Sequence, residues 1–483
     1  MSLPAPSINI ASGEEFSGLA AWMNQAIQLR IQCIVEMTAD NVHDLRVSLR
    51  RCRSMASGMR EVDPHPDWRK LNRQARGLFN PLGELRDTQV LLEWTQKLMP
   101  ENDPVGISLM ALLLEREEAI KQKLQPVLIG FSEEDWRSLS QSLPARLEGL
   151  KPDGPVFEIV ALQRLGEARS LHKQALRNRT HNSFHRLRVG IKHLRYTVEN
   201  FLPERHALWK TGFKQIQDCL GEMHDLFVLW RTMPQVGPIL DKPSRLKWRS
   251  IIDSQIATRL DFYRSLTMGP DSLWWVWRSG LPTGDAMHKA SVEKVEMWAR
   301  LKDPDFARAR NVRDLSLGLF EGLTGSPGGP SFKNPLTRYY LEIAAMMHQI
   351  GRSQNKRPWH KESAAMIKAM PPLPGWTERD MDMVAQIVRH QRGMMPSENG
   401  FQFKSLPAES RRLLMFLTGV LRLARLLGTD PQFATENLKI ESSQHAIHIT
   451  AAGWSLAEAK GHTLARDRYL IETVCKKPIV FRF

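Results

Sequence analysis

The sequence has few cysteines and no long uncharged apolar run. Its four cysteines form no C-x-x-C pair, which argues against a zinc knuckle or a disulfide framework and favours a reducing cytoplasm. No uncharged apolar run reaches the roughly 18 residues that a membrane-spanning helix needs. Residues 1–18 lack the basic and apolar regions of a signal peptide. We therefore expect a cytoplasmic protein with no membrane partner.

Acidic residues are outnumbered by basic ones. The chain has 67 Lys and Arg against 52 Asp and Glu, which gives a formal net charge of +15 at pH 7. Such a surface should attract polyanions, and nucleic acid, anionic lipid and inorganic polyphosphate are all candidates. A basic surface that is merely solvated is the alternative, and only the positions of the charges can decide between them.

The chain's 483 residues are enough for at least two domains. Helical periodicity dominates, and turns rich in proline and glycine interrupt it. A break in composition at 268–285 contains Trp274, Trp275 and Trp277, which we expect to pack between the two domains rather than to stack on bases. The last segment alternates like a hairpin, then becomes helical, and ends as a strand. We expect a mainly α protein with a helical domain at 14–267 (two repeats, 14–135 and 155–267), a linker at 268–285, a second helical domain at 286–430 and a small α+β appendage at 431–483.

Two motifs of the first domain occur twice, in the same order and at nearly the same spacing. "HDLRVSLRRCRS", from His43, recurs as "HRLRVGIKHLRY", from His185. "LGELRDTQV", from Leu82, recurs as "LGEMHDLFV", from Leu220. The duplication predicts two related helical bundles.

On a helix, each copy of the first motif places its basic side chains in one arc of about 80° beside a separate apolar stripe. The stripes hold Val42, Leu45, Leu49, Cys52 and Met59 in the first copy, and Phe184, Leu187, Ile191, Leu194 and Phe201 in the second. We therefore expect the stripes to pack the bundles and the basic arcs to line a groove between helices. Four like charges so close repel one another, which suggests a missing counter-anion.

The second motif adds basic residues and a glycine to this face. Arg76, Gly83 and Arg86 align with Lys214, Gly221 and His224. A glycine here lets a ligand or a neighbouring chain segment come close. Asp87 and Asp225 follow, and we expect them to orient or partly neutralise neighbouring basic groups.

A solvated face or a ladder of ion pairs is the alternative for one basic helix. Acidic partners one turn away are scarce, however, because only Asp40 and Glu199 qualify. Proteins that bind single-stranded nucleic acid interleave aromatic residues for base stacking, whereas these basic faces hold little besides Tyr196. Nucleic acid is therefore the less favoured partner, and a ligand made only of phosphate fits better.

The duplicated motifs resemble the two halves of a CHAD domain, an α-helical domain whose members bind inorganic polyphosphate in a basic channel between pseudo-symmetric bundles. The resemblance covers about residues 14–266 and implies association with polyphosphate granules in the cytoplasm. His224 departs from the Arg86 of the first copy, which should make that end weaker and more sensitive to pH. The residues that it implies as phosphate contacts are His43, Arg46, Arg50, Arg53, Arg76, Arg86, His185, Arg188, Lys192, Arg195, Lys214 and His224.

Residues 290–483 resemble the C-terminal, HD-like domain of the exopolyphosphatase and guanosine pentaphosphate phosphohydrolase family. A metal-dependent HD enzyme needs a His-Asp pair and a distal Asp, but here Gln349 follows His348 and Arg425 stands at the distal position. A cation there would repel a divalent ion. We therefore expect no metal, no cofactor and no catalytic residue.

The main hypothesis is a protein that binds polyphosphate without catalysis, with unknown protein partners. The alternative is a phosphohydrolase that acts on polyphosphate or a phosphorylated nucleotide through the region of His348. Whether the chain is an enzyme stays open at this point. Several basic residues of the second domain either extend the polyanion surface or are simply solvated: Arg352, Lys356, Arg357, His360, Arg389, His390 and Arg392.

Overall fold

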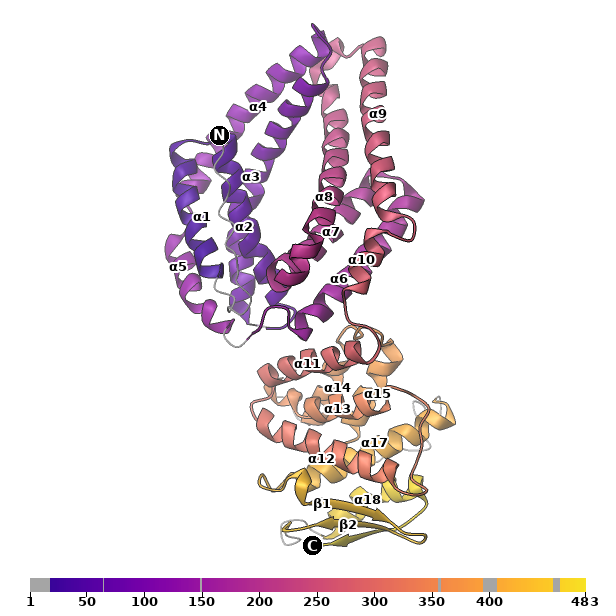
Figure 1. The fold of residues 1–483 in the computed structure, drawn as a ribbon. Helices are drawn as coiled ribbons and strands as arrows, with labels where there is room; N and C mark the ends of the chain where they lie inside the picture. The colour runs from indigo at the N-terminus through magenta and orange to yellow at the C-terminus, as the bar shows by residue number, and fades with distance from the viewer. Residues whose placement is uncertain (1–17, 64, 148–149, 355–357, 394–405, 455–460) are drawn as a thin grey trace. The chain divides into compact units, whose positions relative to one another are not determined.

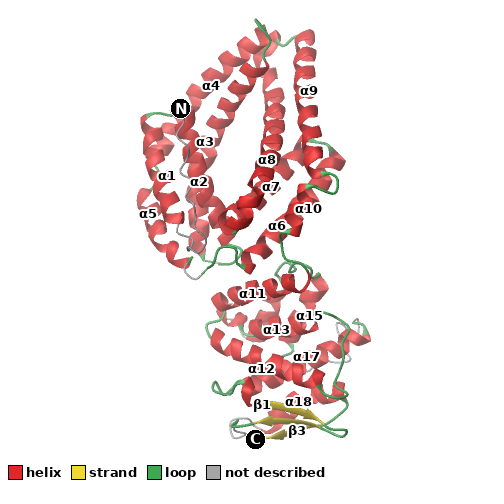
Figure 2. Cartoon of the chain, viewed as in Figure 1, coloured by secondary structure: helices red, strands yellow, loops and turns green. Residues whose placement is uncertain are grey.

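The computed structural model describes residues 18–483 except 64, 148–149, 355–357, 394–405 and 455–460. The chain divides into two compact units between Pro282 and Thr283. The first unit is helical in its described residues, and the second is helical with a small sheet (Figures 1 and 2). The predicted fold class is therefore confirmed.

The first unit contains two repeats whose helices follow in the same order. In each repeat, consecutive helices pack against each other as antiparallel neighbours (Figure 1). The first repeat and its extension comprise α1 (Gly18–Val35), α2 (Ala39–Met59), α3 (Pro66–Leu98), α4 (Pro104–Ile129), α5 (Glu133–Ser142) and η1 (Pro144–Arg146). The second comprises α6 (Pro155–Asn178), α7 (His181–Phe201), α8 (Pro203–Thr232), η2 (Met233–Ile239), α9 (Lys242–Thr267) and α10 (Leu273–Ser279).

Equivalent helices of the two repeats begin with equivalent caps. The side chain of Thr38 accepts a hydrogen bond from the Asn41 amide before α2, and that of Thr180 accepts one from the Ser183 amide before α7. All ten residues of the predicted apolar stripes are buried. The duplication in sequence is thus a duplication in structure, and the basic arcs of α2 and α7 lie beside the packed stripes.

The two repeats pack on each other at two places. Near one end, α2 contacts α7, where the Asn200 amide donates to Ser54 Oγ at 2.8 Å. At the other end, α3 and α4 share an apolar core with α8 and α9, in which Trp94 and Trp248 are buried. Helices α3 and α8 run between these two ends and carry the second basic motif.

Helix α10 occupies part of the segment that the sequence presents as a linker. Trp274 lies against His172 of α6, and Trp277 stacks on Phe213 of α8, with ring centroids 5.1 and 4.4 Å apart respectively. Trp275 is 62% exposed. The expectation that the tryptophans pack between the domains is therefore wrong for Trp274 and Trp277, which complete the core of the first unit.

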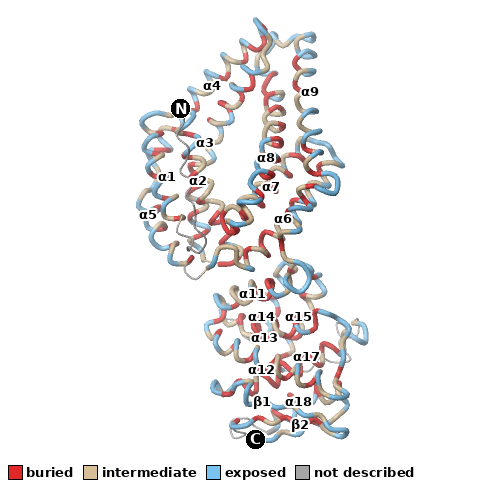
Figure 3. The backbone as a smooth tube through the Cα atoms, viewed as in Figure 1, coloured by how far each residue is buried: buried red, intermediate tan, exposed pale blue. Residues whose placement is uncertain are grey.

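In its described residues, the second unit has an apolar core to which seven α-helices and a sheet contribute. Helices α13 and α17 are buried on most of their faces (Figure 3). Its helices are α11 (Gly284–Lys302), α12 (Phe306–Gly325), α13 (Thr337–Met347), η3 (Ile350–Gln354), α14 (Trp359–Lys368), α15 (Glu378–Arg389), α17 (Ala408–Leu427), η4 (Thr435–Asn437) and α18 (Gly461–Cys475).

The sheet has the strand order β1 (Leu438–Ser442), β2 (Ile447–Ala451) and β3 (Ile479–Arg482). β1 and β2 are antiparallel, whereas β2 and β3 are parallel because α18 connects them. The sheet packs on α12 through Gly322: a Cβ there would lie 2.6 Å from the Ile440 side chain. The predicted hairpin, helix and final strand are confirmed.

Candidate anion-binding groove

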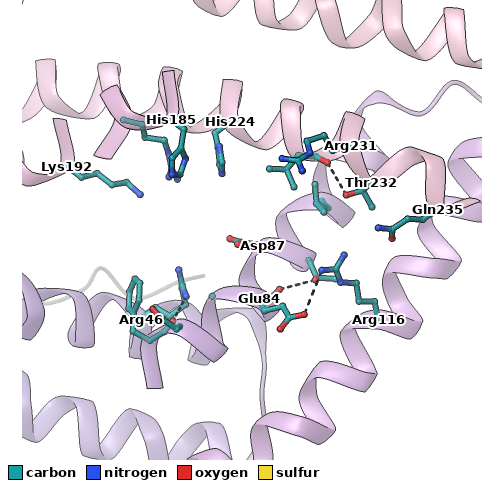
Figure 4. Close-up of a pocket in the computed structure, with 17 residues that line it drawn as sticks. Arg46, Glu84, Asp87, Arg116, His185, Lys192, His224, Arg231, Thr232 and Gln235 are labelled. Carbon is teal, nitrogen blue, oxygen red and sulfur yellow. Dashed lines mark hydrogen bonds and ion pairs between the residues drawn. The ribbon is translucent and has the colours of Figure 1, made fainter. Parts of the chain in front are cut away.

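A cavity of about 720 Å³ lies between the two repeats of the first unit. It is lined by α2, α3 and α4 on one side and by α7, α8 and η2 on the other. Figure 4 shows Lys192, His185 and His224 directed into it from the second repeat and Arg46 directed into it from the first. The basic arcs of the two repeats therefore face a common space.

Two smaller cavities extend the large one, each sharing lining residues with the cavity before it. One of about 190 Å³ shares Arg46, Arg188 and Lys192 with the large cavity, and one of about 100 Å³ shares Arg50 with the second. We call the three together the groove. Nine of the twelve sequence-predicted residues line it: His43, Arg46, Arg50, Arg86, His185, Arg188, Lys192, Arg195 and His224.

Three predicted residues do not line the groove. Arg53 lies just beside it, with its guanidinium 4.5 Å from the centre of the Phe79 ring. Arg76 is exposed on α3 and close enough to Arg53 to lower the pKa of that guanidinium, after burial. Lys214 is exposed on α8. The helical arcs therefore included residues that lie outside the groove, because spacing along a helix does not show where the groove ends.

The groove also contains basic residues that the motif comparison missed. Arg116 of α4 and Arg231 near the end of α8 line the large cavity. Arg231 lies two turns beyond His224 on the same helix face, so helical spacing could have found it. Its equivalent in the first repeat is Glu93, which pairs with Arg86 at 3.0 Å. Because the two repeats carry opposite charges at this position, the comparison of their motifs did not reveal Arg231.

Few carboxylates neutralise the groove. Glu93 pairs with Arg86, Glu199 pairs with Arg195 at 3.4 Å, and Glu84 pairs with Arg116 at 3.8 Å (Figure 4). Within the described parts of the chain, Arg50, Arg188 and Lys192 have no carboxylate at ion-pair distance. Glu199 was one of the two acids expected from the sequence, and Asp40 makes no such pair with His43.

The electrostatics of the groove centre follow from this shortage. Burial, followed by repulsion from Arg188 and Arg50, lowers the pKa of Lys192 to about 7. Burial also lowers the pKa of Arg46 to about 10, and Arg50 adds to the effect. The centre of the groove therefore holds positive charge at a cost that an anion would remove.

Asp87 and Asp225 lie in this positive field, and neither forms an ion pair with a described residue. Burial raises the pKa of Asp225 to about 6, with Arg188 opposing and Asp87 adding to the shift. Asp87 in turn opposes the lowering of the Arg46 pKa. They partly offset the charge of their neighbours, as expected.

Three histidines gather at one side of the large cavity. His181 Nε2 lies 3.1 Å from His224 Nδ1, and the rings of His185 and His224 are 4.9 Å apart. Burial, then Arg188, lowers the pKa of His224 to about 3. His224 is therefore neutral near pH 7, which fits the expected weaker contact relative to Arg86 but gives this residue no pH dependence near neutrality.

The aromatic rings in the groove are covered by guanidinium groups. Arg46 and Arg53 lie 4.4 and 4.5 Å from the centre of the Phe79 ring, and Arg50 lies 5.8 Å from that of Tyr196. Rings covered in this way are less free to stack on bases.

The basic face of α2 lies closely on α3. Arg46 Nη1 donates to the Phe79 carbonyl at 2.9 Å, and its guanidinium passes directly over Gly83. A Cβ at residue 83 would lie 2.9 Å from Arg46 Nη1. The glycine therefore makes room for a neighbouring arginine side chain, where the sequence suggested a ligand or a backbone.

Comparison with known proteins follows the same division of the chain. The first unit is a duplicated helical domain with a cationic groove, and residues 25–234 match the family model of the CHAD domain. Residues 289–470 match that of Ppx/GppA phosphatase, domain III. The chain therefore combines a CHAD domain with a domain of the Ppx/GppA domain III family, as the sequence motifs indicated. A crystal structure of the CHAD domain from the plant Ricinus communis is 25% identical, with a TM-score of 0.39, over 51% of this chain and 88% of that one.

The second unit places His348 in its core, 2% exposed, with Nδ1 2.6 Å from the Ala345 carbonyl. Burial, then Arg425, holds the pKa of His348 well below its usual range. The described residues contain no group of three or more His, Cys, Asp or Glu side chains that could hold a metal ion. Lys356 and Arg357 lie outside the described residues. No described helix is long and apolar enough to cross a membrane.

Proposed function

We propose that the groove binds inorganic polyphosphate. The observation that carries this proposal is the meeting of basic side chains from two repeats around shared cavities that contain few carboxylates. A chain of phosphates supplies closely spaced negative charge, and guanidinium groups bind phosphate oxygens in pairs.

Two buried polar atoms in the groove that lack hydrogen-bond partners support the binding of an anion there. His185 Nδ1 and Arg188 Nε are buried and have no hydrogen-bond partner among the described residues. Such atoms are costly to leave unpaired, and phosphate oxygens are suitable acceptors for the guanidinium nitrogen. The coverage of Phe79 and Tyr196 by arginines favours phosphate over bases as the bound chemistry.

Fluorescence polarisation with labelled polyphosphate tests this function. Unlabelled polyphosphate should displace the probe at a phosphate concentration roughly tenfold below that of single-stranded RNA, because arginines already cover the Phe79 and Tyr196 rings on which bases would stack. Equal displacement per phosphate by RNA would reduce the groove to a general site for polyanions.

We further propose that the chain binds polyphosphate without cleaving it and associates with polyphosphate granules in the cytoplasm. Purified protein incubated with polyphosphate and Mg²⁺ or Mn²⁺ should release no phosphate, since the arginine at position 425 stands where an HD enzyme has an acidic metal ligand. Metal-dependent release that is lost on changing His348 would contradict this and support a phosphohydrolase. A fluorescent fusion should co-localise with granules, and the Arg50→Glu, Lys192→Glu variant should not.

A further inference from the structure

A second group of basic side chains lies in the second unit, around the buried His348. We call it the arginine cluster, and its members come from four separate elements: Arg308 of α12, Arg352 of η3, Arg392 after α15 and Arg425 of α17. Hydrogen bonds through the His348 carbonyl join the segments that carry Arg352, Arg392 and Arg425, and Arg308 acts on them electrostatically. Burial, then Arg392, lowers the pKa of Arg425 to about 9, and Arg308 adds to the effect.

The turn that carries Arg392 is fixed on both sides. Arg425 Nη1 donates to the Gln391 carbonyl at 2.7 Å, and Arg422 Nη2 donates to the Gly393 carbonyl at 3.2 Å. The Gln391 side chain also donates to the His348 carbonyl at 2.6 Å. The backbone at Arg392 is therefore held in place.

The segment that carries Arg352 is tied to the same carbonyl. Ser363 Oγ lies 3.2 Å from the His348 oxygen and accepts the Gly351 amide at 2.9 Å. A Cβ at Gly351 would lie 2.4 Å from the Trp359 carbonyl, so only glycine allows this approach. The two segments that carry Arg352 and Arg392 are thus both tied by hydrogen bonds to the His348 carbonyl.

The arginine cluster is short of acidic partners. Among the residues that the structure describes, Arg308 and Arg392 make no ion pair. Arg352 has Asp305 at 3.7 Å. Of the two remaining acids that act on the cluster, Asp467 is paired with Arg466 at 3.0 Å. Asp303 accepts the Asp305 amide through Oδ1, and its buried Oδ2 has no hydrogen-bond partner among the described residues.

A purely structural role explains only part of this arrangement. Arg425 binds the Gln391 carbonyl just after α15, and that contact would stabilise the fold without any ligand. It does not explain why Arg308, Arg352 and Arg392 are brought toward it, because like charges repel and each removal from water has a cost. A bound anion would explain both.

We propose that the arginine cluster is a phosphate-binding site of the second unit, separate from the groove and independent of the groove's function. Its ligand is a phosphate group, which forms paired hydrogen bonds with guanidinium groups. The group can be free phosphate, a short polyphosphate or the phosphate of a nucleotide. Arg308 and Arg392, which form no ion pair among the described residues, supply its main contacts.

Calorimetric titration of the full chain tests the site, in a background that carries Arg50→Glu and Lys192→Glu so that the groove is disabled. Orthophosphate, tripolyphosphate, ATP and sulfate are titrated at constant ionic strength, and the tightest ligand identifies the source of the phosphate. Arg308→Gln and Arg392→Gln should each weaken binding roughly tenfold, since each removes a charge-assisted contact. Arg310→Gln is the matched control, because Arg310 is on the same helix and already pairs with Glu296 at 3.1 Å.

Two further measurements separate ligand binding from a structural role. Without ligand, Arg392→Gln should leave the melting temperature unchanged or raise it, because it relieves repulsion. Hydrogen exchange of the unmodified chain should slow on adding phosphate in peptides that span 348–353 and 386–393. Absence of phosphate binding in the groove-disabled background, or equal binding by Arg392→Gln and Arg310→Gln, would overturn the proposal while leaving that for the groove intact.

Discussion

Arg46 of α2 lies across Gly83 of α3, so that a Cβ at residue 83 would come within 2.9 Å of its Nη1. The equivalent pair of the second repeat is looser, because a Cβ at Gly221 would lie 3.9 Å from Arg188 Nε. The first repeat therefore fixes its central arginine by close contact with a helix backbone, and the second does not.

Gly83→Ala should weaken polyphosphate binding several-fold, because the methyl group displaces the Arg46 guanidinium from the groove. The far end of an arginine moves easily, so the free energy of unfolding should not fall. Gly221→Ala is the control: it should stabilise the fold by about 0.5–1 kcal/mol, as expected for a helical glycine, with binding unchanged. Polarisation titrations and urea unfolding measure both effects, and equal loss of binding in the two variants would contradict the role of Gly83.

The groove's charges should appear in the salt dependence of binding. Log affinity falls with log salt concentration at a slope that reflects the number of neutralised phosphates. Arg50→Glu and Lys192→Glu should each flatten that slope and weaken binding at least roughly tenfold. Arg186→Glu, an exposed change on the same helix as Lys192, should reduce affinity only slightly. Equal slopes in all three variants would show that the site has been assigned to the wrong residues.

Lys192 should make the stability of the protein depend on pH. Its pKa is lowered to about 7 in the folded state by burial and then by Arg188, so the unfolded state binds the proton more tightly. The destabilising effect is fully present below pH 7 and disappears as the pH rises toward the ordinary lysine pKa. Lys192→Met should therefore be more stable than the native chain at pH 6, and the gap should shrink by pH 9. Urea unfolding at several pH values checks this, and a gap that does not change with pH would contradict it.

Binding should be coupled to the uptake of protons. A phosphate chain beside Lys192 favours its charged form, so its pKa should rise on binding. At pH 8 the complex should therefore take up a fraction of a proton approaching one, seen as a binding heat that varies with the ionisation enthalpy of the buffer. Lys192→Arg should bind with much less uptake. The same uptake in this variant would instead point to the histidine cluster of His181, His185 and His224.

Asp103 should contribute more to the free energy of unfolding than Asp241, the equivalent helix cap of the second repeat. Asp103 accepts the Gly106 amide before α4 and also Trp248 Nε1 at 2.9 Å, whereas Asp241 accepts hydrogen bonds from Ser244 before α9. Asp103→Ala should cost about 2–4 kcal/mol, because it also leaves a buried indole N–H unpaired, and Asp241→Ala about 1 kcal/mol. Similar losses in urea unfolding would contradict a role for Asp103 in joining the repeats.

Acid should remove the contribution of Asp103. Burial acts to raise the pKa of Asp103, but the hydrogen bonds from Gly106 and Trp248 outweigh it and the pKa is lowered. Its stabilisation is present above the ordinary carboxyl pKa and is lost as the pH falls through the lowered one. The difference between the native chain and Asp103→Ala should therefore narrow toward pH 2.

The sequence by itself determined the helical repeats and their two faces. Helical spacing decides which side chains share a face, so the stripes of α2 and α7 and the basic arcs beside them could be read without coordinates. The alternating pattern near the C-terminus predicted its strands, because successive side chains of a strand point to opposite faces.

Only the tertiary structure decided where the groove ends. Arg76 and Lys214 belong to the correct arcs yet lie outside the groove, while Arg116 and Arg231 complete it from positions that no motif marks. The packing of the two repeats on each other sets the boundary, through contacts such as Asn200 to Ser54 between residues far apart in the chain. Spacing along one helix contains no information about which neighbour will cover it, and for that reason the arginine cluster around His348 also became visible only in the folded chain.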